Sequence, residues 1–458
     1  MSIPAEIFKA YDIRGVVGDT ITEEITFQIG QAIGSEVIKA GKNSIVIGRD
    51  GRLSGPSLAK ALSDGLRATG VDVTDIGVAP SPVVYFSAYQ LNISSCVAIT
   101  GSHNPPDYNG FKIVIDGTTL SAERIQQLRE RIENNALSQG TGSFAEVAVI
   151  DSYITRIVDD ITLARPMKIV IDCGNGVGGA TAPTLFRALG CEVIDLFSEV
   201  DGNFPNHHPD PAKLENLQDL IEAVKENDAE IGLAFDGDAD RLGVVTSKGE
   251  VIWPDRQMIL FARDILSRNP GEEIIYDVKC SRTLATEIQN AGGKATMWRT
   301  GHSFIKAKLK ETGAALAGEM SGHIFFKERW FGFDDGVYAG ARLLELLSKR
   351  EETPQAIFDS LPNTINTPEL HIKMENFGEH YTLMDELAKN ADFPDEQVST
   401  FDGLRVDFET GFGLIRPSNT TPVLVMRFEG DDQRSLEAIQ DKFRELILKT
   451  RPTITPPF

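Results

Sequence analysis

Three aspartates at alternate positions carry the sharpest chemical signal in this sequence. Asp236, Asp238 and Asp240 follow the apolar run Ile231–Phe235, and a second apolar run, Leu242–Thr246, follows the loop. On an extended backbone, side chains at positions i, i+2 and i+4 point the same way, and three carboxylates so close repel one another unless a cation lies among them. An all-oxygen ligand set favours Mg²⁺ or Ca²⁺ over zinc. The spacing therefore predicts a metal site, with a solvated acidic turn as the alternative.

A serine is the second candidate for chemistry. Ser102 lies in a loop, residues 100–106, that follows the apolar run Cys96–Ile99 and contains two prolines. We expect a serine on a stiffened loop at the end of a strand to be presented rather than buried. His103 and Lys112 make this loop polar and partly cationic, so Ser102 is predicted to take or hold a charged group. A tight turn is the alternative, and a hydrolase is disfavoured because the GxSxG elbow is absent.

Two further loops are rich in groups that bind oxygen-rich ligands. Residues 416–422 offer a guanidinium, three hydroxyls, an amide and backbone N–H groups, which together suit an oxyanion such as phosphate. Residues 318–323 place Glu319, Ser321 and His323 at alternate positions, which on an extended backbone would share one face and suit sugar hydroxyls. A proline-bounded turn and a plain polar edge are the respective alternatives.

A glycine-rich turn offers a different function. Residues 174–179 fit the GxGxxG pattern of dinucleotide-binding proteins, follow a strand, precede a helix and have Asp195 on the next strand. Asp172 and Cys173 separate the strand from the first glycine, which weakens the match. A structural strand-to-helix turn is favoured, and an NAD-dependent oxidoreductase is kept as an alternative.

The elements that must position these loops alternate between short apolar strands and helices, which indicates an α/β fold with largely parallel sheets. The run at residues 71–76 is expected to lead straight to the serine loop, and residues 135–143 are expected to be a linker. Towards the C-terminus, two β-type runs around Asp402 and Gly403 predict a hairpin and a smaller α+β unit. The length and the spacing predict three similar α/β domains followed by this unit, at residues 1–150, 151–252, 253–364 and 365–458.

Composition restricts the class of partner. The 458-residue chain has a net charge of −22, which argues against general nucleic-acid binding but allows a local basic pocket for a small anion. Its four cysteines form no CxxC pair, and no run resembles a signal peptide or a membrane span. We therefore expect a cytoplasmic protein with no membrane contact.

Taken together, these loops resemble those of the α-D-phosphohexomutase family, most closely its bacterial phosphomannomutase/phosphoglucomutase branch. The resemblance spans nearly the whole chain, in the expected order. It is carried by residues 9–15 (Lys-Ala-Tyr-Asp-Ile-Arg-Gly), 100–105 (Thr-Gly-Ser-His-Asn-Pro), 201–205 (Asp-Gly-Asn-Phe-Pro), 236–241 (Asp-Gly-Asp-Ala-Asp-Arg), 318–323 (Gly-Glu-Met-Ser-Gly-His) and 416–422 (Arg-Pro-Ser-Asn-Thr-Thr-Pro).

The resemblance implies an activity and a set of roles. It implies reversible conversion of hexose 6-phosphate and hexose 1-phosphate, through a phosphoserine and a mannose or glucose 1,6-bisphosphate, in four domains around a central active-site cleft. Ser102 would carry the phosphate and, with Asp236, Asp238 and Asp240, would hold one Mg²⁺. The groups around the reacting phosphate would be His103, Lys112, Arg14 and Arg241. The further substrate contacts would be Tyr11, Lys279, Gly301, His302, Glu319, Ser321, His323, Arg416, Ser418, Asn419 and Thr420.

Several choices stay open at this level. The general acid or base is one of Lys112, His103 and His323. A phosphoglucosamine mutase is the nearest rival, although Met320 favours the mannose/glucose branch, and a non-catalytic sugar-phosphate binder is a further alternative. Ala239 stands where several relatives carry glycine, and we expect little consequence because the position offers no ligand. The last domain is expected to move about residues 360–367; the oligomeric state is open, and a monomer is compatible with the sequence.

Overall fold

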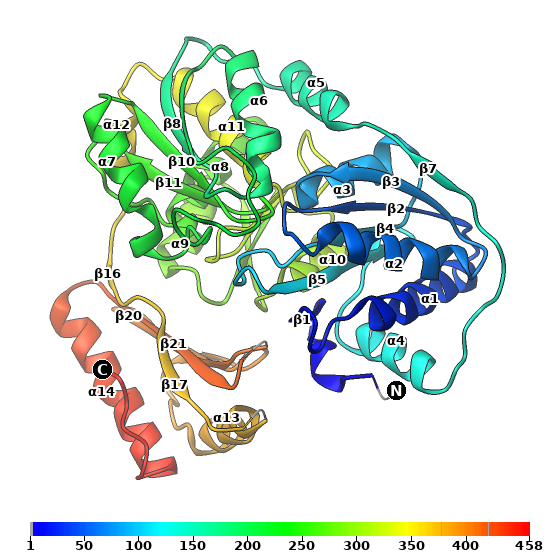
Figure 1. The fold of residues 1–458 in the computed structure, drawn as a ribbon. Helices are drawn as coiled ribbons and strands as arrows, with labels where there is room; N and C mark the ends of the chain where they lie inside the picture. Colours follow the sequence, from blue (N-terminus) through cyan, green and yellow to red (C-terminus); the bar gives the residue numbers. More distant parts are fainter. Residues whose placement is uncertain (1–2, 377, 420) are drawn as a thin grey trace.

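The computed structural model describes residues 3–376, 378–419 and 421–458, and these fold into four sheets with helices packed on them (Figure 1). Three sheets are mainly parallel or mixed and covered by helices, and the fourth, of six strands, is antiparallel. The predicted fold class is confirmed.

The first sheet has the order β1-β5-β4-β2-β3-β7, with β6 paired to β5. Strands β2, β3, β4 and β7 run parallel, whereas β5 runs antiparallel to both β1 and β4. Its elements are η1 Ala5–Ile7, β1 Ile13–Val16, α1 Glu23–Lys39, β2 Ser44–Arg49, α2 Gly55–Arg67, β3 Asp72–Val78, α3 Ser81–Gln90, β4 Cys96–Ile99, β5 Tyr108–Ile115, β6 Thr118–Thr119, α4 Glu123–Glu133 and β7 Phe144–Glu146.

The second and third sheets are built alike, in the orders β11-β10-β8-β9 and β13-β12-β14-β15. In each, three strands are parallel and the last strand of the unit returns antiparallel beside its neighbour. The second unit comprises α5 Ile150–Asp160, β8 Lys168–Asp172, η2 Val177–Ala180, α6 Ala182–Ala188, β9 Glu192–Leu196, η3 Leu214–Leu217, α7 Gln218–Glu226, β10 Ile231–Phe235 and β11 Leu242–Thr246. The third comprises α8 Pro254–Arg268, β12 Glu273–Asp277, α9 Arg282–Asn290, β13 Lys294–Trp298, α10 His302–Thr312, β14 Leu316–Gly318, β15 Ile324–Phe326, α11 Gly336–Ser348 and α12 Pro354–Asp359.

The C-terminal sheet is antiparallel, in the order β16-β21-β20-β19-β18 with β17 also paired to β21. The predicted hairpin is present, because β18 and β19 pair across the turn that contains Asp402 and Gly403. The elements are β16 Ile365–Asn366, β17 Leu370–Lys373, α13 Glu379–Asn390, β18 Gln397–Ser399, β19 Leu404–Phe408, β20 Gly411–Pro417, β21 Val423–Gly430 and α14 Gln433–Thr450.

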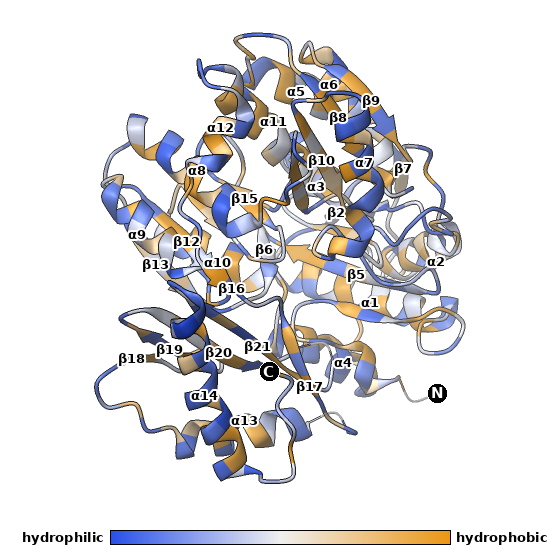
Figure 2. Ribbon diagram, turned by 90° about the vertical axis from the view of Figure 1, so that its left-hand side faces the viewer, coloured by the Kyte–Doolittle hydropathy of each residue, from blue (hydrophilic) through white to orange (hydrophobic). Residues whose placement is uncertain are grey.

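The apolar cores divide the molecule unequally. One buried cluster runs continuously from α3 of the first unit through α5 and β10 to α8 and α11, so the first three units share a core. The C-terminal unit buries its own cluster between α13, α14 and its sheet. Figure 2 shows apolar faces of helices turned towards the sheets, as expected for amphipathic helices on a covered sheet. The first three units are therefore fused by packing, whereas the fourth has a core of its own and meets the third through a small cluster of Val278, Phe412 and Leu414.

Two local expectations need correction. Helix α3 lies between β3 and the serine loop, where no helix was expected; it is apolar almost all round because both sides are buried, and so it lacks the one-sided pattern that marks a helix. The expected linker at residues 135–143 carries no helix or strand, but it is held to the end of α2 by hydrogen bonds from the backbone N–H groups of Gly140 and Gly142. It then continues into β7 at the edge of the first sheet.

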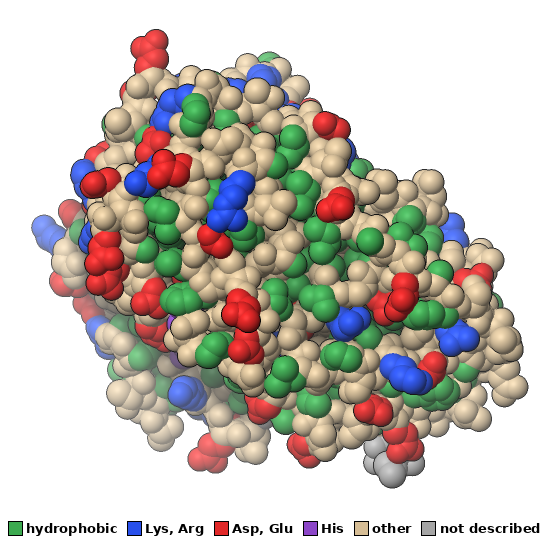
Figure 3. Space-filling view, turned by 45° about the horizontal axis from the view of Figure 1, so that its top comes forward, with side chains coloured by type: hydrophobic (Ala, Val, Ile, Leu, Met, Phe, Trp, Pro, Cys, Tyr) green, Lys and Arg blue, Asp and Glu red, His purple; other side chains and the backbone are tan. Residues whose placement is uncertain are grey.

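The surface and the thiols agree with the composition. Acidic and basic side chains are interspersed on the face shown in Figure 3. The four cysteines are buried and unpaired. Among the described residues, we find no helix with the length and hydropathy needed to cross a membrane.

Candidate active site

Ser102 lies where the first two units meet. Its Oγ is 3.1 Å from Asp236 Oδ2 and 3.3 Å from His103 Nδ1. Its φ of +48° is left-handed, a conformation that costs energy for a residue with a side chain. The side chain is only 1% exposed, so the expectation of a presented serine is wrong. The aspartate loop covers it so closely that a Cβ at Gly237 would lie 2.3 Å from the carbonyl oxygen of Ser102.

Arg52 holds the serine loop in this shape, and sequence reasoning missed it. Its guanidinium donates to the backbone carbonyls of Ser102, Asn104, Pro105 and Tyr108. Its Nε donates to Asp50 Oδ2 at 3.2 Å, and the same oxygen accepts from Thr100 Oγ1 at 2.7 Å and from the Gly101 N–H at 3.2 Å. The signal was available: an aspartate and an arginine directly after a parallel strand lie at the sheet edge where ligand sites form.

The aspartate loop is a turn between β10 and β11 rather than an extended segment. Ala239 has a φ of +61° at its centre, so the backbone position that relatives fill with glycine is left-handed here. The turn still brings ligand oxygens of Asp236, Asp238 and Asp240 within 4.8 Å of one another, and all three residues are fully buried. Asp238 Oδ1 has no hydrogen-bond partner among the described residues. These carboxylates therefore fit a hard divalent cation.

Lys112 is the nearest counter-charge to this loop. Its Nζ lies 2.7 Å from Asp238 Oδ2 and 2.5 Å from Asp240 Oδ2, and it is almost fully buried. Burial would lower the pKa of Lys112, but the two aspartates raise it above its usual value, so the ammonium stays charged. Burial, together with Asp240 and Asp238, raises the pKa of Asp236 well above its usual value. The three carboxylates are held close together against their mutual repulsion, which a bound cation would offset.

Two arginines flank the serine and the aspartate loop. Arg14 Nη1 donates to Asn104 Oδ1 at 2.5 Å, beside the serine. Arg241 Nε lies 3.6 Å from Asp236 Oδ2. Both guanidiniums are therefore placed next to the position of Ser102, where a phosphate dianion would need them.

Residues 318–323, the loop predicted to bind sugar hydroxyls (the sugar loop), form a hairpin turn between β14 and β15. The expectation of an extended backbone is therefore wrong here too. The turn still brings the predicted groups together: Ser321 Oγ is 2.9 Å and Glu319 Oε2 is 3.3 Å from His323 Nδ1. Glu319 Oε1 accepts a hydrogen bond from the N–H of Gly301 at 2.5 Å, where α10 begins.

Two histidines connect this loop to the metal ligands and to the N-terminal segment. His323 Nε2 lies 3.2 Å from Asp240 Oδ1; burial lowers the pKa of His323, but Asp240 outweighs it and raises the pKa to about 9. The ring of His302 lies 5.8 Å from that of His323 and 5.5 Å from that of Tyr11. Neither nitrogen of His302 has a hydrogen-bond partner among the described residues, although the residue is buried. Unpaired donors facing polar neighbours are available to a ligand.

The predicted phosphate cradle lies at the end of β20 in the C-terminal unit. Arg416 is buried and bonds both carboxylate oxygens of Asp402, from Nε at 3.1 Å and from Nη2 at 3.2 Å. Ser418 Oγ is 3.0 Å from Thr421 Oγ1, and Asn419 is half-buried beside it. Thr420, also predicted to contact the substrate, lies outside the described residues.

Contacts across the unit boundary place this cradle against the third unit. Lys279 Nζ donates to Glu369 Oε1 at 2.8 Å, and the N–H of Thr300 donates to Asp402 Oδ2 at 2.8 Å. Burial raises the pKa of Tyr11, and the nearby guanidinium of Arg416 opposes this shift, so the cradle also lies close to the N-terminal segment. The described members of the predicted site are thus brought into one region from all four units.

The glycine-rich turn at residues 174–179 serves packing. A Cβ at Gly176 would lie 2.9 Å from Gly237, and one at Gly179 would lie 1.9 Å from the carbonyl oxygen of Ser198. The N–H of Val177, which a pyrophosphate would need, donates to the carbonyl of Gly237 at 3.0 Å. These glycines let the turn approach the aspartate loop and leave no room for a dinucleotide, so the NAD alternative fails.

Comparison with known proteins agrees with this geometry. Four segments match family descriptions that all begin "Phosphoglucomutase/phosphomannomutase": alpha/beta/alpha domain I at residues 5–139, domain II at 151–249, domain III at 253–365 and the C-terminal domain at 379–446. The chain is 55% identical to a phosphomannomutase/phosphoglucomutase of Pseudomonas aeruginosa, over 100% of this chain and 98% of that protein. It is 54% identical to a phosphoglucomutase of Neisseria gonorrhoeae, over 99% of both chains. A crystal structure of a phosphoglucomutase/phosphomannomutase family protein from Burkholderia thailandensis matches with a TM-score of 0.95 and 54% identity, over 100% of both chains.

Proposed function

This chain belongs to the phosphoglucomutase/phosphomannomutase family and is a hexose-phosphate mutase, and from that premise we propose that Ser102 carries the phosphate between the two ends of the sugar. The carrying observation is that its Oγ is buried 3.1 Å from Asp236 Oδ2, with three cations in the surrounding loops: Lys112 pairs with Asp238, Arg14 bonds Asn104, and Arg241 lies beside Asp236. A phosphoserine has nearly two negative charges, and it requires this kind of counter-charge when water is excluded.

The reaction is two phosphoryl transfers. In the first, the bond between phosphorus and Ser102 Oγ breaks and a bond to the free hydroxyl oxygen of the hexose phosphate forms. The hydroxyl proton passes to a base, and Ser102 Oγ takes up a proton. The bisphosphate then turns end for end. In the second transfer its other phosphate passes to Ser102 Oγ, which gives up its proton, and the freed sugar oxygen takes up a proton. The serine proton has two acceptors within reach in the unphosphorylated state, Asp236 Oδ2 at 3.1 Å and His103 Nδ1 at 3.3 Å.

The residues divide the remaining work by position. Asp236, Asp238 and Asp240 would hold Mg²⁺, which supplies charge neutralisation at the transferring phosphoryl group. Glu319, Ser321 and His323 present acceptors and donors to sugar hydroxyls.

The distal phosphate is proposed to bind in the C-terminal cradle. Arg416, Ser418 and Asn419 supply one fixed guanidinium and adaptable side chains that can accept either end of the sugar. Lys279 lies beside them across the unit boundary. The predicted motion of the C-terminal unit would close this grip, and X-ray scattering with and without substrate tests it: an unchanged profile removes its support.

The substrate class includes both hexoses in this proposal, because similar proteins bear both names. Wild type is assayed with mannose, glucose and glucosamine phosphates, Mg²⁺ and a catalytic amount of hexose bisphosphate. We expect turnover of the first two; glucosamine phosphate as the best substrate would favour the rival mutase. The unpaired buried cysteines support the proposal of a cytoplasmic location.

Ser102→Ala tests the covalent role, with Ser57→Ala on the exposed side of α2 as the matched control. The Ser102 variant should lose about 10³-fold or more of kcat and should no longer take radiolabelled phosphate from a hexose bisphosphate, whereas the control should behave as wild type. A fully active Ser102→Ala enzyme, or label on another residue, would refute the assignment.

A further inference from the structure

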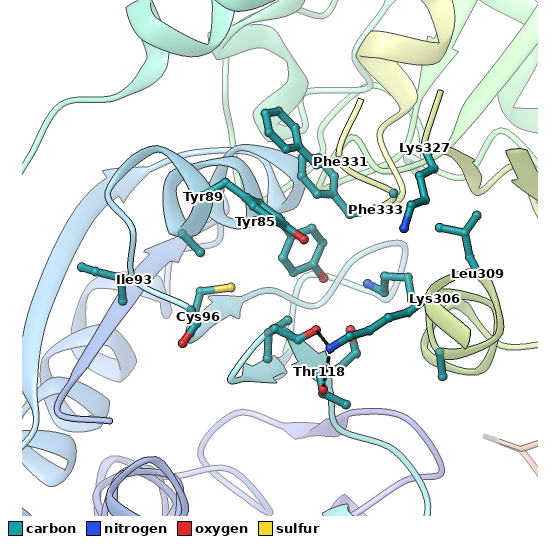
Figure 4. Close-up of a pocket in the computed structure, with 18 of the residues that line it drawn as sticks. Tyr85, Tyr89, Ile93, Cys96, Thr118, Lys306, Leu309, Lys327, Phe331 and Phe333 are labelled. Carbon is teal, nitrogen blue, oxygen red and sulfur yellow. Dashed lines mark hydrogen bonds between the residues drawn. The ribbon is translucent and has the colours of Figure 1, made fainter. Parts of the chain in front are cut away.

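A cavity of about 540 Å³ lies between the first and third units, and no residue of the four active-site loops lines it (Figure 4). Its walls come from α3, the turn between β5 and β6, α10 and the segment after β15. Its volume falls in the range of sites that enclose small molecules. None of the residues assigned above to metal, serine or sugar phosphate lines it.

One wall is aromatic and partly open to solvent. Tyr89 is 51% exposed, and its ring lies 4.9 Å from that of Phe331, centroid to centroid, at an interplanar angle of 28°. Phe333 stacks 6.0 Å from Phe331 at 6°, and Tyr85 lies 5.6 Å from Phe333. Tyr85 and Phe333 are buried, so the ring surface open to a ligand is that of Tyr89 and the partly exposed Phe331.

The same cavity is lined by three lysines, Lys306, Lys310 and Lys327. Figure 4 shows Lys306 and Lys327 beside it. Lys310 Nζ donates to the carbonyl of Gly117 at 3.0 Å and to Thr118 Oγ1 at 3.2 Å, which are both neutral acceptors. Within the described part of the chain, neither Lys310 nor Lys327 has a carboxylate within 4.0 Å, whereas Lys306 is paired with Asp334 at 2.9 Å. Two unpaired cations beside an apolar cavity, in a chain of net charge −22, favour an anion.

The aromatic wall also contains a polar group, the hydroxyl of Tyr85. The hydroxyl of Tyr85 is buried and has no hydrogen-bond partner among the described residues. Cys96, which also lines the cavity, is kept as a neutral thiol because burial raises its pKa to about 12. The lining therefore combines stacked rings, one orphan hydroxyl and positive charge at the rim.

We propose that this cavity is a second ligand site, separate from the sugar-phosphate site, that binds a small aromatic anion. The planar ring of the ligand would lie against Tyr89 and Phe331, and its carboxylate, sulfonate or phosphate would reach Lys327 and Lys310. The shared chemistry is a flat apolar body with one acidic group.

The test uses anilinonaphthalene sulfonate as the probe and follows its fluorescence in titrations of the full chain. We expect saturable binding with one site per chain. Lys327→Glu should weaken it about tenfold, because it places like charges together, and Phe331→Ala should weaken it by a similar factor through loss of the stacked ring. Lys389→Glu, an equally exposed lysine on α13, is the matched control and should bind as wild type. All three variants should retain the kcat of the mutase.

Two further binding measurements complete the test, one with a competing sugar phosphate and one with an uncharged probe. Saturating glucose 6-phosphate should not displace the probe, and the same ring system without its sulfonate should bind more weakly. The proposal is overturned if no saturable binding occurs, if the cavity variants bind like the Lys389 control, if the uncharged ring binds as tightly, or if the sugar phosphate displaces the probe.

Discussion

The serine end and the distal-phosphate end of the active site are built in opposite ways. At the serine end, charged groups from three units meet within the region fused by a shared apolar core, and the ion pairs of Lys112 and His323 with Asp240 cross unit boundaries. At the distal end, Arg416 is held by Asp402 of its own unit, which has a separate core. The pair Lys279–Glu369 that joins this unit to the third leaves Glu369 39% exposed.

The difference suggests how one active site can hold the reacting groups in fixed positions at one end and accept either end of the sugar at the other. Phosphoryl transfer needs fixed positions and excluded water, and buried groups locked between packed units provide both. The proposed grip on the distal phosphate must accept either end of the sugar, which suits a unit with a core of its own. Buried Arg427, paired with Asp255 at 3.2 Å, keeps that unit attached.

The largest effect is expected from Asp238→Asn, which keeps the side-chain volume but removes one negative charge from the serine end of the active site. We expect kcat to fall roughly 10³-fold and the Mg²⁺ requirement to rise, because the carboxylate pairs with Lys112 and is proposed to bind the cation. Steady-state kinetics over a Mg²⁺ titration measure both. Asp195→Asn, on the exposed strand β9, is the control; equal behaviour of the two variants would contradict the metal assignment.

Arg52→Lys is expected to act next most strongly. Lysine cannot reproduce the five hydrogen bonds by which the guanidinium fixes the serine loop. A misplaced serine should cost about 100-fold in kcat, with little change in KM, and slower transfer of label from a hexose bisphosphate. Arg67→Lys, which loses one bond to the carbonyl of Gly142, should be near wild type. A rise in KM with unchanged kcat would show that Arg52 has a different role.

Arg416→Ala should weaken the distal-phosphate end of the site. Its effect should be mainly on KM, whereas that of Arg52→Lys should be mainly on kcat. We expect KM for the hexose phosphates to rise about tenfold while kcat falls less, because a guanidinium that holds a distal phosphate contributes mainly uniform binding. Arg434→Ala, an exposed arginine on α14, serves as the control. A large fall in kcat at unchanged KM would break the proposed division between the two ends.

The smallest effect is expected from Glu369→Gln, which tests the exposed pair between units. Lys279 lowers the pKa of Glu369 to about 2, below its ordinary 4.5. The pair therefore stabilises the fold fully above pH 4.5, and this contribution is lost as the pH falls towards 2. Because the carboxylate is partly solvated, we expect a loss of only about 1 kcal/mol of unfolding free energy at pH 7.

The measurement for Glu369→Gln is denaturant unfolding at several pH values. The difference from wild type should narrow below pH 4.5, where the wild-type carboxylate begins to lose its advantage. Glu437→Gln, an exposed glutamate on α14, should show no such dependence. A pH-independent difference would mean that Glu369 acts through packing rather than charge.

Some of this molecule could be predicted from local patterns. The apolar runs at residues 96–99, 231–235 and 242–246 are strands β4, β10 and β11, because each is short, apolar and bounded by turn-forming residues. Helix α3 was missed because burial on both sides erases its periodicity. Arg52 was missed because, although its position after a strand marks a ligand edge, its bonds to carbonyl oxygens about 50 residues later depend on tertiary packing.

The sequence by itself determined the chemistry: a serine, three aspartates, a sugar-binding turn and a phosphate cradle, each defined by residue types within a few positions. Only the tertiary structure decided their environment. It buried Ser102 under the aspartate loop, turned two segments expected to be extended, and placed Lys112 between carboxylates far away in the chain. The physical reason is that burial and the pKa values that follow from it depend on which units pack together, and that packing is specified by the whole chain.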